Sequence, residues 1–324
     1  MGATEKEKLI MTVQGAIPAS SLGFCHSHEH LFLADGQSAK VHAALRLDDF
    51  DHTVEELELF KSIGGRSIVD AQPVGAGRIA GYLAEASIKT GINIIASTGF
   101  HKLIFYPQDH WIHTVDEDVL TQLYINELNL GMYTNADFEF PSRKLAFKPG
   151  IIKTASDMNG VDAQYKRLFS AAARASVDTG TPILSHTEMG KGALGQIKVF
   201  TDYGVPAESI IICHLDRTVE DIGYHLEVAQ TGVYLEFDTI GRFKYHSDEA
   251  EAEFIVKMVE HGFEDKILIG LDTTRERMKS YGGSLGLDYI KTAFIPLLKE
   301  YGLKDETIQK FVIDNPARAF TKYK

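Results

Sequence analysis

The sequence predicts a (β/α)8 TIM barrel, an α/β fold in which parallel strands alternate with helices, preceded by a short N-terminal β-hairpin. Eight short apolar runs recur between longer amphipathic segments, and several are rich in Ile and Val on both faces, as strands buried on both sides are. Eight such units within 324 residues suit the size of this fold. A doubly wound open sheet is disfavoured, because no Gly-x-Gly-x-x-Gly follows the first run.

The predicted strands are these apolar runs, taken in chain order. They lie at residues 22–25, 67–70, 92–97, 150–153, 182–186, 210–214, 233–237 and 266–272. Helical periodicity precedes the second, fifth and eighth runs, at residues 54–62, 164–179 and 249–261. Glycines typical of helix ends close several helical segments, at Gly64, Gly91, Gly180 and Gly262.

Two segments fall outside the alternation of strands and helices. Residues 11–22 are expected to form a hairpin that closes the bottom of the barrel. Residues 100–147 are too many for a simple helix and are expected to add an elaborate loop. Because no linker or low-complexity tract divides the chain, we expect one domain over residues 1–324, with residues 1–22 leading into the barrel.

Composition excludes several classes of partner. Acidic residues outnumber basic ones by 45 to 33, and no long Lys or Arg run is present, so neither nucleic acid nor an anionic membrane is expected to bind. No apolar stretch approaches the ~20 residues of a membrane span, and Met1 to Leu9 lack the apolar core of a signal peptide. Two cysteines are too few for a disulfide framework. We therefore expect a cytoplasmic enzyme.

Polar side chains gather at the carboxyl ends of the predicted strands, where a barrel of this kind carries its active site. Alternation along the first strand puts three histidines on one face, with Cys25 pointing the other way. Cys25 and Cys213 are accordingly expected on the outer faces of strands one and six, too far apart for a disulfide. The residues at the strand ends are His26, His28, His30, Lys153, His186, His214 and Asp272.

Four histidines, one aspartate and one lysine together can hold two divalent ions, zinc first, with manganese or cobalt as alternatives. A lysine with its ordinary pKa of about 10.4 is a cation that metals repel. Carbon dioxide converts such an amine into an N-carboxylate, which can bridge two metals. Two other interpretations of Lys153 stay open, namely an ion pair with Asp272 and a Schiff-base nucleophile.

Several motifs in the right order make the chain resemble the phosphotriesterase family of the amidohydrolase superfamily from end to end. The first-strand motif is Gly23-Phe24-Cys25-His26-Ser27-His28-Glu29-His30, and the carboxylated-lysine motif is Gly150-Ile151-Ile152-Lys153. The remaining matches are Ser185-His186-Thr187, Cys213-His214, Gly270-Leu271-Asp272 and Asp314-Asn315-Pro316-Ala317-Arg318.

This resemblance implies a binuclear metal site. His28, His30 and Asp272 would hold the buried ion, His186 and His214 the exposed one, and carboxylated Lys153 would bridge both. A metal-bridging hydroxide would attack the substrate, with Asp272 accepting its proton. His26 would then be a core residue deeper in the barrel, and a homodimer would be the common form of the molecule.

The chain departs from the pattern of two familiar activities in the family. After the seventh strand, Asp238 is followed by Thr239, where phosphotriesterases have a histidine and acyl-homoserine lactonases an arginine. Residues 98–102 lack the aromatic pair that is common near those pockets. Neither a paraoxon-type nor an acyl-homoserine lactone substrate is favoured.

Basic residues in the last two loops favour a small anionic substrate instead. Lys244, Arg275 and Tyr281 are expected to encircle a phosphate group. The sequence therefore predicts a lactonase that acts on a small phosphorylated sugar lactone, as one branch of the family does. The alternatives are a phosphotriesterase or carboxylesterase with the same metal core, and a Schiff-base lyase that uses unmodified Lys153.

Overall fold

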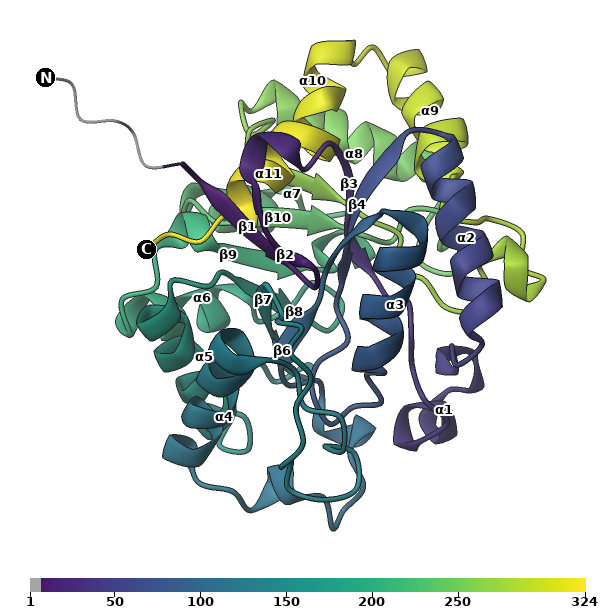
Figure 1. Cartoon of the computed structure of the whole chain (residues 1–324). Coiled ribbons are helices and arrows are strands. Elements are labelled where there is room, and N and C mark those ends of the chain that lie inside the picture. The colour runs from purple at the N-terminus through teal and green to yellow at the C-terminus, as the bar shows by residue number, and fades with distance from the viewer. Residues whose placement is uncertain (1–6) are drawn as a thin grey trace, which may run out of the picture.

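The computed structural model describes residues 7–324 and shows parallel strands surrounded by helices (Figure 1). The strands are β1 Leu9–Thr12, β2 Gly15–Pro18, β3 Phe24–Glu29, β4 Gly65–Asp70, β5 Asn93–Ile95, β6 Ser97–Gly99, β7 Ile151–Ala155, β8 Ile183–His186, β9 Ile210–Cys213, β10 Tyr234–Phe237 and β11 Ile267–Ile269. The predicted polar start of the chain, up to residue 6, lies outside the described residues.

Helices follow most of the strands and cover their outer faces (Figure 1). They are α1 Gln37–Val41, α2 Phe50–Ser62, α3 Ala80–Thr90, α4 Glu117–Leu130, α5 Lys166–Thr179, α6 Ala193–Asp202, α7 Ile222–Gln230, α8 Asp248–Glu260, α9 Ile295–Glu300, α10 Asp305–Gln309 and α11 Asn315–Ala319. Within residues 7–324, no helix is long and apolar enough to cross a membrane.

The strands form two parallel sheets, in the orders β3-β4-β5 and β6-β7-β8-β9-β10-β11. The third predicted strand is divided at Ala96 into β5 and β6, each in a different sheet. The outermost strands β3 and β11 lie side by side, since the Ser27 hydroxyl donates to the Ile269 carbonyl at 2.8 Å. The two-stranded antiparallel sheet β1–β2 spans residues 9–18, which is earlier than the predicted 11–22.

Helix boundaries follow the capping residues that the sequence supplies. The Asp49 and Ser247 side chains accept backbone N–H groups at the starts of α2 and α8. Gly91 and Gly180 adopt the left-handed conformation that ends α3 and α5. The predicted helical segments 54–62, 164–179 and 249–261 correspond to α2, α5 and α8, with boundaries that differ by a few residues.

Alternation along the strands divides the apolar core into two clusters. On β9, Ile210 and Ile212 belong to the large cluster under the helices, whereas Ile211 belongs to a smaller cluster on the opposite, inner face of the strands. Cys25 and Cys213 belong to this inner cluster, so the prediction that they lie on outer faces is wrong. Both are free thiols.

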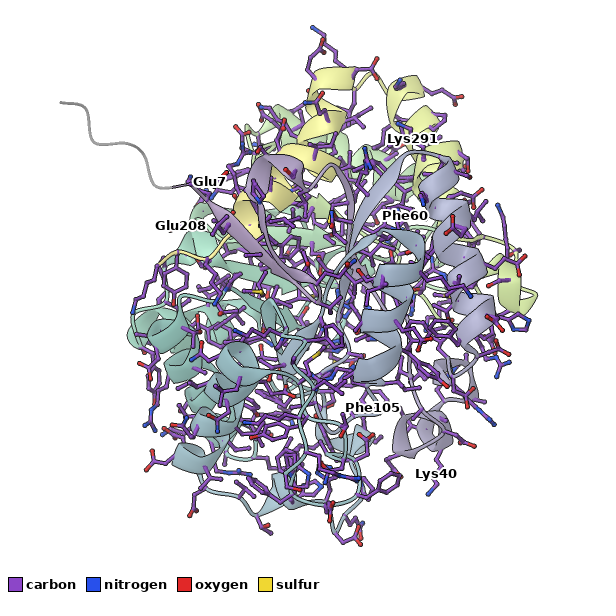
Figure 2. The ribbon with its side chains drawn as sticks, in the orientation of Figure 1. Glu7, Lys40, Phe60, Phe105, Glu208 and Lys291 are labelled. Atoms are coloured by element: carbon purple, nitrogen blue, oxygen red, sulfur yellow. The ribbon has the colours of Figure 1, made fainter. Side chains whose placement is uncertain are left out.

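An irregularity in β3 changes which histidines share a face. The pairing of β3 with β4 shifts register between His26 and Glu29, and such a bulge interrupts strict alternation. His26 consequently lies on the outer face, with its ring centroid 4.6 Å from that of Phe60. Phe60 lies on α2 and is labelled in Figure 2. The predictions that His26 shares a face with His28 and lies deeper in the barrel are therefore wrong, although His26 is a buried core residue.

The long segment 100–147 contains the regular helix α4 as well as loops. A buried ion pair holds it to the rest of the molecule, because Arg78 Nη2 lies 2.6 Å from Glu127 Oε1. Trp111 Nε1 donates to the Ala136 carbonyl at 2.7 Å, which joins the loop before α4 to the loop after it. The segment is thus a packed helix-containing insertion rather than only a loop.

Candidate active site

The structure brings the six predicted metal ligands together at the carboxyl ends of the strands. His30 Nε2 lies 3.3 Å from Asp272 Oδ1, which joins the ends of β3 and β11. Lys153 Nζ, on β7, lies 3.3 Å from His28 Nε2. The rings of His186 and His214 have centroids 4.4 Å apart. These strands are distant in sequence, and the site forms because their carboxyl ends lie together in the fold.

Two of the six residues have strained backbones. His214 has φ of 62° and Asp272 has φ of 48°, both in the left-handed region that residues with a Cβ rarely adopt. His214 directly follows β9, and Asp272 lies three residues after the end of β11. Strain of this kind is concentrated at functional sites, where surrounding contacts hold it in place.

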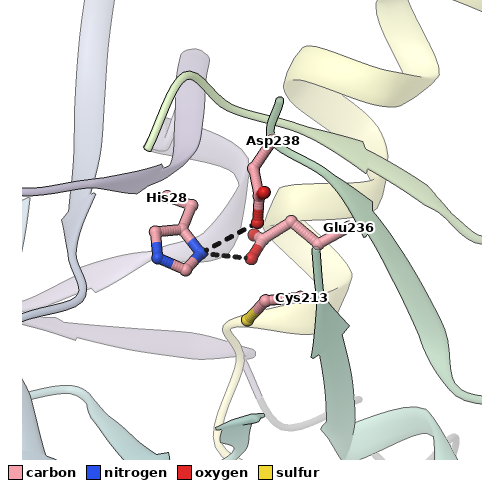
Figure 3. Close-up of side chains that lie close together, drawn as sticks. All are labelled: His28, Cys213, Glu236 and Asp238. Atoms are coloured by element: carbon pink, nitrogen blue, oxygen red, sulfur yellow. Dashed lines mark hydrogen bonds and ion pairs between the residues drawn. The ribbon is translucent and has the colours of Figure 1, made fainter. Parts of the chain in front are cut away.

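Buried carboxylates orient two of the histidines, and Figure 3 shows those around His28. His28 Nδ1 lies 2.7 Å from Glu236 Oε2 and 3.2 Å from Asp238 Oδ2, and Asp238 Oδ1 lies 2.5 Å from His214 Nδ1. Carboxylate oxygens accept, so both Nδ1 atoms carry hydrogens, and in the neutral form of each ring Nε2 offers a lone pair to the site. This is the tautomer that a metal-binding histidine needs.

Charge around His28 links metal binding to proton release. Burial and the neighbouring Lys153 oppose the charged imidazolium, yet the carboxylates of Glu236 and Asp238 hold the pKa of His28 well above its ordinary value. Burial lowers the pKa values of His186 and His214 well below theirs, with further lowering by nearby cations. Two histidines are thus already in the neutral ligand form, whereas His28 has to lose a proton when a metal binds.

Lys153 is fully buried, and no carboxylate oxygen of residues 7–324 lies within ion-pair distance of its amine. The interpretation of Lys153 as an ion-pair partner of Asp272 is therefore wrong. Its polar neighbours are His28 Nε2 at 3.3 Å and Cys213 Sγ at 3.9 Å. An unpaired ammonium ion at such a place is costly, which favours a neutral or chemically modified amine.

Asp272 divides its carboxylate between two sets of partners. Oδ1 faces His30, whereas Oδ2 lies 3.1 Å from both Arg217 Nη2 and Arg242 Nη2. Burial alone would raise the pKa of Asp272, but Arg242 and the histidines hold it well below its usual range. Asp272 is therefore ionised, which is the form of a carboxylate that binds a metal.

The donor set fits divalent metal ions. The ligand atoms of His28, His30 and Asp272 converge within one possible coordination sphere, and so do those of His214, Asp238 and Asp272. A third group joins His28 and Asp238 to Glu236 and Cys213, but its carboxylates are the groups that bind His28 Nδ1. Imidazole and carboxylate ligands suit zinc, manganese and cobalt alike.

Sequence reasoning missed Glu236 and Arg217 as parts of this site. Glu236 had a detectable signal, because a carboxylate two residues before Asp238 lies on the same face of a buried strand. Arg217 lies three residues after His214, in a short 3-10 turn that the sequence does not mark.

Comparisons with known proteins agree with the geometry. The sequence model of the phosphotriesterase family matches residues 8–320. The chain belongs to the phosphotriesterase family. A phospho-furanose lactonase of Mycoplasmopsis synoviae is 32% identical over 97% of this chain and 92% of its own. An aryldialkylphosphatase of Saccharolobus solfataricus is 26% identical, over 94% of this chain and 97% of its own.

Solved structures in this phosphotriesterase family have the same architecture. A lactonase from Listeria monocytogenes matches with a TM-score of 0.89 and 33% identity, over 98% of this chain and 100% of its own. An amidohydrolase from Mycoplasma synoviae matches with a TM-score of 0.92 and 31% identity, over 98% and 93% of the two chains. The chain is thus a metal-dependent hydrolase of the lactonase and phosphotriesterase type. Its family uses a binuclear divalent metal centre, and candidate groups of metal ligands are present in this chain. Family membership favours hydrolysis over the Schiff-base alternative.

A cavity of about 500 Å³ opens above the metal ligands of this family member. Besides Lys153 and the histidines, its basic lining residues are Lys102, Arg217, Arg242, Lys244 and Arg277. Three of these pair with carboxylates at the site. Lys244 has no ion pair with any residue of the described chain, and its Nζ lies over the Tyr245 ring, 4.7 Å from the centroid.

The three predicted phosphate-binding residues are not gathered around one point. Lys244 lines the main cavity, but Arg275 and Tyr281 line an adjoining hollow of about 360 Å³. The Arg275 guanidinium lies over the Tyr281 ring, 5.4 Å from its centroid, and the Tyr281 hydroxyl donates to the Asp49 carbonyl at 2.8 Å. Glu276 borders both spaces, so the hollow and the cavity are neighbours.

Proposed function

We propose that this hydrolase opens a small phosphorylated sugar lactone. The observation that carries the proposal is the ammonium group of Lys244, which is exposed in the metal-site cavity without a carboxylate partner. A cation of this kind attracts an anionic group to the mouth of the site. The similarity to a phospho-furanose lactonase over nearly the whole chain supports the same substrate class.

The proposal includes a closed eight-stranded barrel and a complete ligand set. Contacts between β3 and β11 support closure, since the Asp272 N–H also donates to the His28 carbonyl at 3.0 Å. We assign one ion to His28, His30 and Asp272, and the second to His186 and His214. Lys153 would join the two ions as its N-carboxylate, and zinc is the first choice of metal.

Metal ions held in this way would lower the pKa of a water and polarise the oxygen of the bond under attack. Asp272 is the proton acceptor, because its Oδ1 faces the ligand cluster while two arginines hold Oδ2. These arginines fix the orientation of the carboxylate and keep it ionised. Lys244 binds the anionic end of the substrate and so places the lactone over the ligands.

The first experiment combines metal analysis with a substrate panel. Protein expressed with added zinc or manganese is expected to contain two equivalents of metal. In a pH-indicator assay, we expect acid release from phosphorylated lactones and little from the matching unphosphorylated ones. Hydrolysis of aryl esters or phosphotriesters without any lactone turnover would instead identify one of the alternative hydrolases.

Replacement of Lys244 tests the substrate-binding role. Lys244→Ala removes one charge-assisted contact, and we expect KM for a phosphorylated lactone to rise about 10–100-fold, with little change for an unphosphorylated lactone. Lys198→Ala is the matched control, because Lys198 is an exposed residue on α6 that pairs with Asp202. Equal effects of Lys244→Ala on both lactones would contradict the role. For Arg275→Ala, KM is measured for the same two lactones. A rise for the phosphorylated lactone alone would show that the adjoining hollow takes part in phosphate binding.

A further inference from the structure

His101 is a histidine of the cavity that is not among the proposed metal ligands. It follows β6, where its ring lies between ligands of both proposed ions. Its centroid is 6.4 Å from that of His30, with the rings inclined by 19°, and 5.5 Å from that of His186. No residue of the described chain forms a hydrogen bond with His101 Nε2, so this atom is free to meet a substrate.

The hydrogen bond at Nδ1 determines what Nε2 can do. The backbone N–H of Lys102 donates to His101 Nδ1 at 2.7 Å. A backbone amide can only donate, so Nδ1 uses its lone pair and the ring proton is on Nε2. His28 and His214 have the opposite arrangement, because carboxylates accept from their Nδ1 atoms. Their Nε2 atoms can bind metal, whereas His101 Nε2 presents an N–H.

The His101 ring is held in place before any substrate arrives. The edge of Phe105 contacts it, with centroids 4.4 Å apart and planes at 65°. The backbone N–H of His101 donates to the Tyr106 hydroxyl at 2.9 Å, and Lys102 Nζ lies 2.6 Å from Glu188 Oε2. A donor fixed in this way needs little reorganisation when charge develops nearby.

We propose that His101 donates a hydrogen bond from Nε2 to an oxygen of the ester group under attack. This inference rests on the proposed ester-type hydrolysis. The oxygen gains negative charge in the transition state, so the hydrogen bond strengthens there. The proton stays on the ring, because Nδ1 is occupied by the Lys102 N–H and loss of the Nε2 proton would leave an imidazolate.

Two substitutions in the metal-loaded enzyme test this role. We expect His101→Phe to lower kcat on the lactone about 10²–10³-fold with two metal equivalents retained. His101→Gln, whose side-chain amide also donates, is expected to stay within about tenfold of the wild type. Unchanged kcat in His101→Phe, loss of metal in either variant, or His101→Gln as slow as His101→Phe would each overturn the proposal.

Nitrogen-15 NMR of the histidine rings tests the same assignment without turnover. The His101 signals are those that vanish in His101→Gln, and we expect the tautomer with hydrogen on Nε2; the opposite tautomer would overturn the proposal. If the wild type hydrolyses an aryl ester or phosphotriester but no lactone, the proposed function fails. The comparison of His101→Phe with His101→Gln on that substrate then still decides the role of His101.

Discussion

Glu236 is fully buried behind His28, and its Oε2 lies 2.7 Å from His28 Nδ1. Glu236 is not one of the proposed metal ligands, yet it fixes which nitrogen of His28 faces the metal. Its negative charge also makes the imidazole a stronger electron donor. Metal affinity therefore depends on a residue that never touches substrate.

Replacement of Glu236 measures this dependence. Glu236→Gln keeps the shape and one acceptor oxygen but removes the charge, and we expect metal affinity to fall about 10–100-fold. Competition with a chelator, followed by elemental analysis, gives the affinity directly. Glu208→Gln is the control, because Glu208, labelled in Figure 2, is exposed and is not among the residues that line the cavity. Equal affinities in the two variants would contradict the role.

The sequence identifies the candidate metal ligands better than the residues that hydrogen-bond to them. His186, His214 and Asp272 could be placed because each follows a predicted strand in a motif of known order. The partners that set tautomers and charges come from other strands and loops. Arg217 reaches Asp272 over 55 positions in sequence, and no local pattern reports such a contact.

Among the elements, the segment 100–147 shows how a buried histidine links local structure to pH. His110 Nδ1 accepts from the Ile112 N–H, and its Nε2 lies 3.0 Å from the Ala136 carbonyl. Burial lowers the pKa of His110 from 6.5 to about 4. The neutral ring satisfies both contacts. A second proton would sit on Nδ1, where it would face the Ile112 N–H and remove that hydrogen bond.

The sign of the pH effect follows from this lowered pKa. Below pH 6.5 the unfolded chain takes up a proton that the folded protein refuses until about pH 4, so stability falls as pH drops through this window. We expect His110→Gln to remove about 1–2 kcal/mol of the stability loss between pH 7 and pH 4.5. Thermal unfolding at both pH values measures it. His261→Gln, at an exposed position, should leave the wild-type pH dependence unchanged.

The alternation of strands and helices was predictable, whereas its local interruptions were not. Short apolar runs and terminal glycines indicate where elements begin and end. The division of the third strand at Ala96 and the bulge between His26 and Glu29 depend on how neighbouring strands pair. Those pairings are non-local, which is why strict alternation placed His26 and Cys25 on the wrong faces.

Across the whole molecule, Glu29 joins the first strand of the β3-β4-β5 sheet to the segment after β11. Its carboxylate accepts from the N–H groups of Leu271 and Thr273, at 3.0 and 3.2 Å, and from the Thr273 hydroxyl at 2.7 Å. His26 Nδ1 lies 2.8 Å away on the other side. One buried charge thus connects residues at both ends of the strand order and supports the backbone of Asp272.

Loss of this carboxylate should weaken the whole fold. Glu29→Ala leaves two buried N–H groups and His26 without a partner, and we expect a loss of about 3–5 kcal/mol in the free energy of unfolding. Denaturant titration measures the change. Glu58→Ala, which removes an exposed glutamate from α2, should cost less than about 0.5 kcal/mol. A similar small loss for both variants would contradict the role of Glu29.

The distance along the chain between Glu29 and its partners sets an order of events during synthesis. Leu271 and Thr273 lie 242 and 244 positions later, so they leave the ribosome long after β3 does. Until then Glu29 keeps its hydration, and β3 presents an unpaired edge on one side. Open edges of this kind join other strands readily, so the growing chain is most prone to aggregate before the segment after β11 is made.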